Sequence, residues 1–170
     1  MDREESPDQL DPENSEPQSD PQTWQRDVTS AGEIMTVGVR SVGPEATLED
    51  VARIMRDEHC GAVPVVDPGH RLIGIVTDRD LVVRAAAVGK PLANTRADEV
   101  MTNEIEAVTS DEPLDGVIEL MGRKQVRRIP VVDRSDRLIG IISMGDVATR
   151  ADYDEELCDA LERVSAKRPR

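Results

Sequence analysis

The sequence predicts an α/β protein made of two tandem β-α-β-β-α repeats that pack with pseudo-twofold symmetry, followed by a C-terminal helix. Two observations predict it. Short motifs return at a constant offset of 66 residues without a gap, and within each copy the apolar pattern changes from helical spacing to short β-rich runs. The motifs Met-Thr, Pro-Val-Val-Asp and Arg-Leu-Ile-Gly-Ile begin at Met35, Pro64 and Arg71, and again at Met101, Pro130 and Arg137.

The first helix of each copy follows from apolar spacing. Leu48, Val51 and Met55 recur at helical intervals, which places them on one face of a helix. Thr47 precedes them and is a good N-cap residue, because its hydroxyl can accept a bond from a free backbone N–H. The second copy predicts the equivalent helix over 114–121, with a proline at its start, where proline is tolerated.

Two strands and a second helix follow in each copy. Residues 62–66 form a short β-rich run that closes in the turn 67–69. Residues 72–77 are continuously apolar, so we expect a strand that is buried on both faces. A helix is predicted over 78–88, ending at Gly89. The second copy gives the equivalent elements at Ile129–Val132, Leu138–Ser143 and Met144–Arg150.

The chain divides into five segments. Residues 1–27 carry nine acids, two arginines and four prolines, a composition that predicts a disordered acidic tail. We expect the first repeat at 28–89, a short polar linker at 90–99 and the second repeat at 100–150. One repeat alone is too small to bury its sheet, so the two should share one core. Residues 151–170 predict an amphipathic helix with a basic end, packed on the module or on a second subunit.

Composition argues against several functions. The formal net charge of −14 disfavours nucleic acid and membrane surfaces as partners, and Trp24 and Tyr153 are too few to stack bases. Two cysteines without a CxxC pattern, and a start unlike a signal peptide, indicate a reduced cytoplasmic protein. His59 and Cys60 lack metal-ligand spacing, and no Walker loop or nucleophile elbow is present. We therefore expect neither a metal site nor catalysis.

Each repeat ends its apolar strand in a hydroxyl residue followed three positions later by an aspartate: Thr77 and Asp80, then Ser143 and Asp146. This spacing has two interpretations. It matches a capping box that only satisfies helix N–H groups. It also suits a nucleotide, because a carboxylate can accept both hydroxyls of a ribose and a helix start favours phosphate. The two interpretations are partly compatible.

Taken together, the motifs resemble the CBS domain. The resemblance rests on the runs at 61–67 and 74–80 in the first copy and at 128–133 and 140–146 in the second. It covers residues 31–150. The chain is similar to small stand-alone actinobacterial CBS-pair proteins of the hypoxic-response type.

The resemblance implies a non-catalytic regulatory protein that binds an adenine nucleotide between its repeats. The ligand would be AMP, ADP or ATP, with S-adenosylmethionine as another candidate. Such pairs often form disc-like dimers, so we expect a homodimer that signals to a protein partner. Adenine would contact the Pro-Val-Val strand, ribose the aspartates, and phosphate the hydroxyls and bases. The expected ligand contacts are Ala62, Val63, Pro64, Thr77, Arg79, Asp80, Arg127, Arg128, Ile129, Pro130, Ser143, Gly145 and Asp146.

The two clefts are not expected to be equal. Gly145 replaces Arg79 in the second motif, which lets a ligand approach the backbone closely. Arg127 and Arg128 precede the second strand, and a guanidinium can hold phosphate through two bonds; the cleft between the repeats could still bring Arg128 to the phosphate of either site. These features weakly favour the second motif as the working site. The alternative is a protein–protein interaction or dimerisation module of the same fold, with no nucleotide bound.

Overall fold

The computed structural model describes residues 29–150 and Arg163. The first half contains α1 (Ala31–Ile34), β1 (Thr36–Val37), α2 (Leu48–Asp57), β2 (Ala62–Val66), β3 (Leu72–Thr77), α3 (Asp78–Asp80), the π turn η1 (Leu81–Ala85) and the 3₁₀ turn η2 (Ala86–Val88). The second half contains the 3₁₀ turn η3 (Ala97–Glu99), β4 (Val108–Thr109), α4 (Leu114–Lys124), β5 (Arg128–Val132), β6 (Leu138–Ser143) and α5 (Met144–Arg150).

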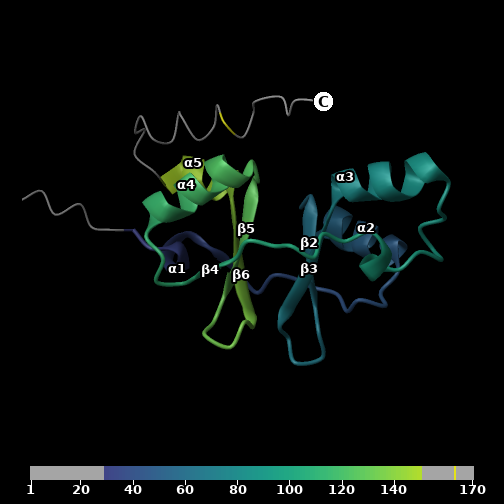
Figure 1. The fold of residues 1–170 in the computed structure, drawn as a ribbon, viewed down its shortest axis with the longest axis horizontal. Helices are drawn as coiled ribbons and strands as arrows, with labels where there is room; N and C mark the ends of the chain where they lie inside the picture. The colour runs from purple at the N-terminus through teal and green to yellow at the C-terminus, as the bar shows by residue number, and fades with distance from the viewer. Residues whose placement is uncertain (1–28, 151–162, 164–170) are drawn as a thin grey trace, which may run out of the picture.

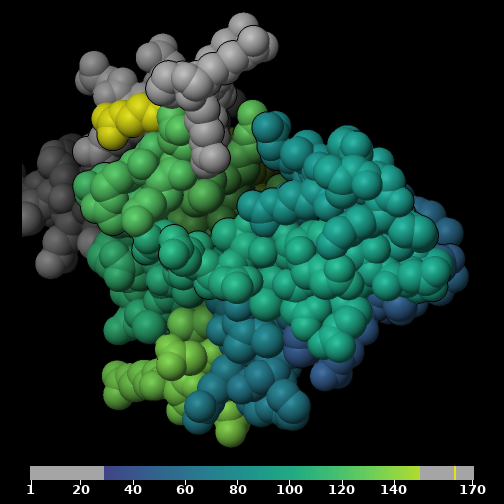
Figure 2. Space-filling view, turned by 45° about the vertical axis from the view of Figure 1, so that its right-hand side comes forward, coloured from purple at the N-terminus to yellow at the C-terminus, as the bar shows by residue number. Residues whose placement is uncertain are grey.

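Two sheets stand side by side at the centre of the molecule, with helices on their outer sides (Figure 1). α1, α4 and α5 lie beside β5 and β6, and α2 and α3 lie beside β2 and β3. In the space-filling view the two halves meet along much of their length (Figure 2). The predicted α/β class and tandem arrangement are confirmed.

The predicted helices form, with small changes at their ends. The Thr47 hydroxyl accepts a bond from the Asp50 N–H at 3.2 Å, as an N-cap should. Helix α4 runs three residues further than predicted, to Lys124, and ends where Gln125 is left-handed with φ 54°. The helix predicted over 78–88 is continuous but changes from α to π to 3₁₀ geometry, and Gly89 ends it with φ 75°.

The two strand pairs repeat each other. β2 runs antiparallel to β3 with Ala62 opposite Thr77, and β5 runs antiparallel to β6 with Arg128 opposite Ser143. Each pair also carries an irregularity at the same place, between Val65 and Val66 and between Val131 and Val132. The repeat in the sequence is therefore a repeat in the backbone.

The described chain has two hydrophobic cores, one on the helix side of each sheet, and each of these helix-side cores includes residues from the other half of the chain. The cluster around β5 and β6 includes Ala31 and Ile34, which are 0% and 2% exposed. The cluster around β2 and β3 includes Ala97 and Val100 in return. We predicted a polar linker over 90–99, but Thr95 and Ala97 are buried, because this segment packs back onto the first repeat.

In each repeat, the Met-Thr motif crosses to the sheet of the other repeat and pairs with it; this mutual crossing is called the exchange below. Thr36 in β1 pairs with Ile141 of β6, and Thr102 pairs with Ile75 of β3. The methionine before each threonine lies over a glycine of the opposite sheet: the Met35 sulfur is 2.6 Å from where a Gly140 Cβ would lie. Met101 lies still closer over Gly74, the corresponding glycine of β3. The glycines of the repeated Gly-Ile motif are thus required by the crossing methionines.

The hairpin loops join the halves a second time. The Leu72 N–H donates to the Asp136 carbonyl at 3.0 Å, and the Leu138 N–H donates to the His70 carbonyl at 3.1 Å. One expectation is wrong here. We predicted that 72–77 is buried on both faces, but alternate residues, including Ile73 and Ile75, stay partly exposed. Their side of β3 faces a gap between the repeats instead of a helix.

The predicted acidic tail and the predicted C-terminal helix lie outside the described residues, apart from Arg163. The Arg163 carbonyl accepts a hydrogen bond from the Gln125 side-chain amide at 3.3 Å. Within the part of the chain that the structure describes, no helix is both long and apolar enough to span a bilayer.

The crossing segments predict the effect of filling one glycine. In Gly140→Ala the new methyl would lie 2.6 Å from the Met35 sulfur and 2.9 Å from the Thr36 carbonyl oxygen. The backbone oxygen cannot swing away, so we expect the free energy of unfolding to fall by about 1–3 kcal/mol. Gly43→Ala is the control, because nothing lies within 4 Å of its methyl. Urea unfolding measures both, and equal midpoints would contradict the contact.

Candidate functional site

Both hydroxyl–aspartate motifs form capping boxes. Asp80 Oδ2 accepts from the Thr77 N–H at 2.9 Å and from the Thr77 hydroxyl at 2.6 Å. Asp146 Oδ2 accepts from the Ser143 N–H at 2.7 Å and from the Ser143 hydroxyl at 2.6 Å. One oxygen has only two lone-pair directions, so Oδ2 is fully used. A ligand would have to bind the other oxygen, Oδ1.

At Asp80 the second oxygen faces a cation. Arg84 Nε lies 3.3 Å from Asp80 Oδ1, while Arg84 Nη1 donates to the Val100 carbonyl at 2.7 Å. The same Nη1 lies 3.3 Å from the Thr102 hydroxyl oxygen. Asp80 is only 8% exposed, and a buried charge needs such partners. Arg84 therefore links the motif carboxylate to the segment that crosses from the second repeat; the side chain of its repeat equivalent, Arg150, lies outside the described residues.

The structure brings the predicted strand residues to these motifs. Ala62 lies directly opposite Thr77 in the sheet. The backbone N–H of Asp78 donates to the Gly61 carbonyl at 3.1 Å, and the N–H of Met144 donates to the Arg127 carbonyl at 2.9 Å. The beginning of each inner strand thus touches the beginning of the following helix.

The side chains of this strand are less available than predicted. Val63 and Ile129 are fully buried in the two helix-side cores, because alternate strand residues face opposite ways. Pro64 and Pro130 are buried as well. A ligand could meet these four residues only through their backbone. Arg79, Gly145 and Arg127 are exposed, and Arg128 is partly exposed.

Arg128 crosses to the other repeat. Its Nη2 atom is 3.1 Å from the position that a Cβ on Gly61 would take, and Asp78 Oδ2 is 2.7 Å from the same point. The guanidinium thus lies at the start of α3, beside the first motif. The sequence weakly favours Arg128 at the second motif but leaves either site open, and the structure places its charge at the first.

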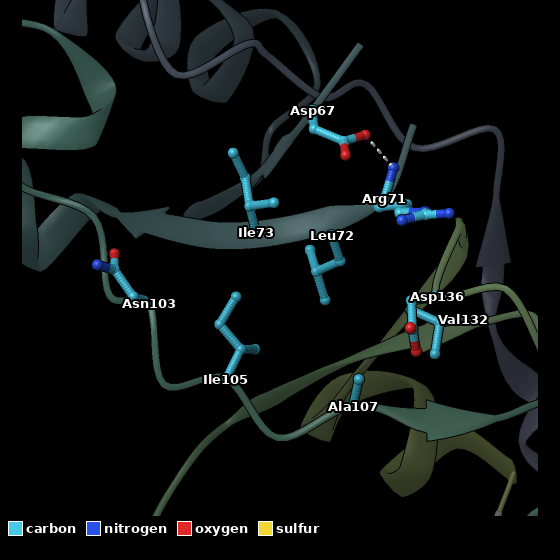
Figure 3. A pocket seen from close by; sticks show the side chains of 9 residues that line it. All are labelled: Asp67, Arg71, Leu72, Ile73, Asn103, Ile105, Ala107, Val132 and Asp136. Carbon is cyan, nitrogen blue, oxygen red and sulfur yellow. Dashed lines mark hydrogen bonds between the residues drawn. The ribbon is translucent and has the colours of Figure 1, made fainter. Parts of the chain in front are cut away.

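A cavity of about 410 Å³ opens between the repeats, towards the hairpin end of β3 (Figure 3). β3 and its loop supply one wall, and the second repeat supplies the other. Apolar side chains lie within it and charged ones at its edge. The lining residues are Asp67, Arg71, Leu72, Ile73, Asn103, Ile105, Ala107, Val132 and Asp136.

None of the residues that line this cavity is among the ligand contacts expected from the sequence. Ile73 belongs to a strand that the sequence predicts to be buried on both faces, and residues 103–107 carry no motif. One signal was present: Ile105 and Ala107 closely follow the Met-Thr motif, which crosses to β3. Ile73 and Thr77 share one face of β3, roughly 13 Å apart at about 3.3 Å per residue. The cavity and the first motif therefore lie along the same strand face, with Ile75 between them.

The turn beside this cavity is held by a carboxylate. Asp133 Oδ1 accepts from the N–H groups of Arg137 at 3.0 Å and Ser135 at 2.8 Å, and these bonds lower the pKa of Asp133.

The Cys60 thiol donates to the Ala62 carbonyl at 3.4 Å. Over 29–150, no three His, Cys, Asp or Glu residues gather as metal ligands would.

Comparison with known families identifies the class of this protein. The family profile of the CBS domain matches residues 31–86 and 97–152. The chain therefore belongs to the CBS-domain family and carries two tandem copies of the domain. Hypoxic response protein 1 of Mycobacterium tuberculosis is 36% identical over 121 residues, which cover 71% of this chain and 84% of that protein.

Solved structures agree with this assignment. Hypoxic Response Protein I, with two coordinated zinc ions, has a TM-score of 0.67 at 35% identity, covering 73% of this chain and 100% of that one. The CBS domain pair of protein MJ0100, in complex with 5'-methylthioadenosine and S-adenosyl-L-methionine, has a TM-score of 0.66 at 26% identity. That match covers 72% of this chain and 94% of the other.

The contacts of Arg84 predict a stability effect. Arg84→Met keeps the aliphatic stem but leaves the Asp80 carboxylate and the Val100 carbonyl without their cationic partner. We expect a loss of about 1.5–3 kcal/mol in the free energy of unfolding. Arg40→Met is the control: the two arginine side chains are similarly exposed, at 53% and 47%, but the partner side chain of Glu58 is 48% exposed whereas that of Asp80 is 11% exposed, and exposed pairs contribute about 1 kcal/mol at most. Similar losses in both variants, measured by chemical denaturation, would refute the role of Arg84.

Proposed function

We propose that this protein is a regulatory CBS pair that binds an adenine nucleotide between its repeats, along the open face of β3. One observation carries the proposal: a cavity built by both repeats lies at one end of that face, and the Thr77 and Asp80 motif lies at the other. A cavity of about 410 Å³ falls within the usual range for small-molecule sites, about 300–1,000 Å³.

The ligand would lie with its base towards the hairpin end. Ile73, Ile105 and Ala107 offer apolar contacts to a flat ring, and Asn103 offers an amide at the cavity's edge. The ribose would then lie near Ile75, within reach of Asp80. Because Oδ2 of Asp80 is used by the cap, the sugar hydroxyls would bind Oδ1, where Arg84 now lies at 3.3 Å.

The relatives support the ligand class. The MJ0100 pair holds two adenosyl compounds, and its fold and identity connect it to this chain. CBS pairs are generally regulatory, so we propose that nucleotide binding here controls a protein partner in the cytoplasm and that no reaction is catalysed. AMP, ADP and ATP are the first candidates, with S-adenosylmethionine as another.

A second role, self-association, is favoured by one surface. Val82, Val83 and Val88 on the helical segment 81–88 are 61%, 49% and 63% exposed. A soluble protein seldom leaves several large apolar side chains together on one helix unless a partner covers them. We propose that this segment contributes to a homodimer. If the clefts bind no nucleotide, this interaction would be the main function of the fold.

Two substitutions test the nucleotide proposal. Asp80→Ala and Asp146→Ala should each weaken binding at their own cleft by roughly ten- to hundredfold, because a charged acceptor for the ribose is lost. Asp146→Ala should also lower stability by about 1 kcal/mol through loss of the cap, and Asp80→Ala by more, because it also removes the partner of Arg84. Calorimetry with AMP, ADP, ATP and S-adenosylmethionine gives the affinities, and thermal unfolding gives the stabilities.

The capping role alone predicts a different result. Both variants would then be destabilised while their dissociation constants matched that of the wild type. Thr47→Ala is a matched control, because it removes a helix cap far from either cleft. It should lower stability about as much as Asp146→Ala does and leave nucleotide affinity unchanged.

A further inference from the structure

The two clefts differ in the charge that the opposite repeat brings to them. Arg128 and Ala62 occupy equivalent positions at the 66-residue offset, and so do Arg79 and Gly145. Arg128 reaches across to Gly61 in the first repeat. Its counterpart Ala62 is short, uncharged and 4% exposed. The cation that the second repeat provides to the first motif thus has no equivalent at the second.

The Arg128 guanidinium reaches its position because residue 61 is glycine. A Cβ at Gly61 would lie 3.1 Å from Arg128 Nη2 and 2.7 Å from Asp78 Oδ2, so any larger residue would force these two groups to shift. The Gly61 carbonyl accepts the Asp78 N–H at 3.1 Å, which places the guanidinium at the start of α3. It lies next to Thr77, at the end of β3 away from the cavity.

The guanidinium of Arg128 is available for a ligand. Within residues 29–150 no hydrogen bond or ion pair of its guanidinium is present, although the side chain is only partly exposed. A partly desolvated guanidinium is well suited to bind phosphate, because its planar N–H groups match two phosphate oxygens.

We propose that Arg128 makes the first cleft selective for 5'-phosphorylated adenosine, with the phosphate bound by its guanidinium at the start of α3, whereas the second cleft has no such preference. This inference rests on the proposed function, since it assumes that adenosine lies along β3 with its ribose at Asp80. Base, sugar and phosphate would then follow the strand from Ile105 to Arg128.

A structural role for Arg128 makes a different prediction. Arg128 could attract Asp78 and so hold the repeats together, although no ion pair forms between them. In the ligand role the Asp78 carboxylate opposes phosphate, because it repels the anion and competes for the guanidinium. Asp78→Asn should then raise the affinity for AMP severalfold and leave that for adenosine unchanged. In the structural role it should lower stability and leave both affinities alone.

The decisive experiment compares adenosine with AMP on the full chain. In Arg128→Gln, the affinity for AMP should fall at least about tenfold, the usual loss for a bond to a charged group, while that for adenosine stays within about twofold. Arg128→Lys should retain most of the preference for AMP. Arg134→Gln, an exposed arginine in the second hairpin loop, is the control and should change neither affinity. Melting temperatures confirm that each variant is folded.

NMR assigns the effect to a cleft. In the wild type, AMP should shift the amide signals of Thr77 and Asp80 at lower concentration than those of Ser143 and Asp146. If Arg128→Gln weakens the affinities for AMP and for adenosine equally, or leaves the ratio of the two affinities unchanged, the inference is overturned while the proposed function stays intact. If the wild type binds neither adenosine nor AMP, the proposed function itself is wrong, and this inference with it.

Discussion

The packing of each Met-Thr segment on the sheet of the opposite repeat is the contact on which the rest of this structure depends. Met35 lies over Gly140 and Met101 over Gly74, and each following threonine pairs with an isoleucine of the same strand. Neither sheet nor either helix-side core is complete without residues from the other half. Two small repeats thereby become one cooperative unit, which neither could form alone at this size.

The same exchange creates the gap between the repeats. After Thr102 has paired with β3, the chain must return to its own sheet at β4, and residues 103–107 bridge the distance. This bridge leaves one face of β3 without a covering helix, and the cavity forms there. The cavity is thus a consequence of the connection between repeats, and residues of both repeats line it. A ligand in this gap would contact both halves of the molecule.

Local structure could be predicted from the sequence because it is determined locally. The strands at 62–66 and 72–77 and the cap at Thr47 follow from side-chain pattern and short-range hydrogen bonding. The exchange could not be predicted in this way. The sequence repeat shows that the two copies are alike. It does not show whether each Met-Thr segment pairs with the sheet of its own copy or with the sheet of the other copy. The cavity was missed for the same reason, since the partial exposure of Ile73 depends on which segment crosses it.

The reach of Arg128 also depends on the arrangement of the repeats, which explains why the sequence could not decide which motif receives its charge. Because the crossing Met-Thr segments join the two repeats, both cores should unfold together. Native-state hydrogen exchange tests this most directly, through the slowest amides of the two cores, such as Val76 in β3 and Ile142 in β6. If the repeats form one cooperative unit, the amides of Val76 and Ile142 should exchange with the same free energy of opening, near that of global unfolding. A difference above about 1 kcal/mol, with one core exchanging while the other stays protected, would contradict it.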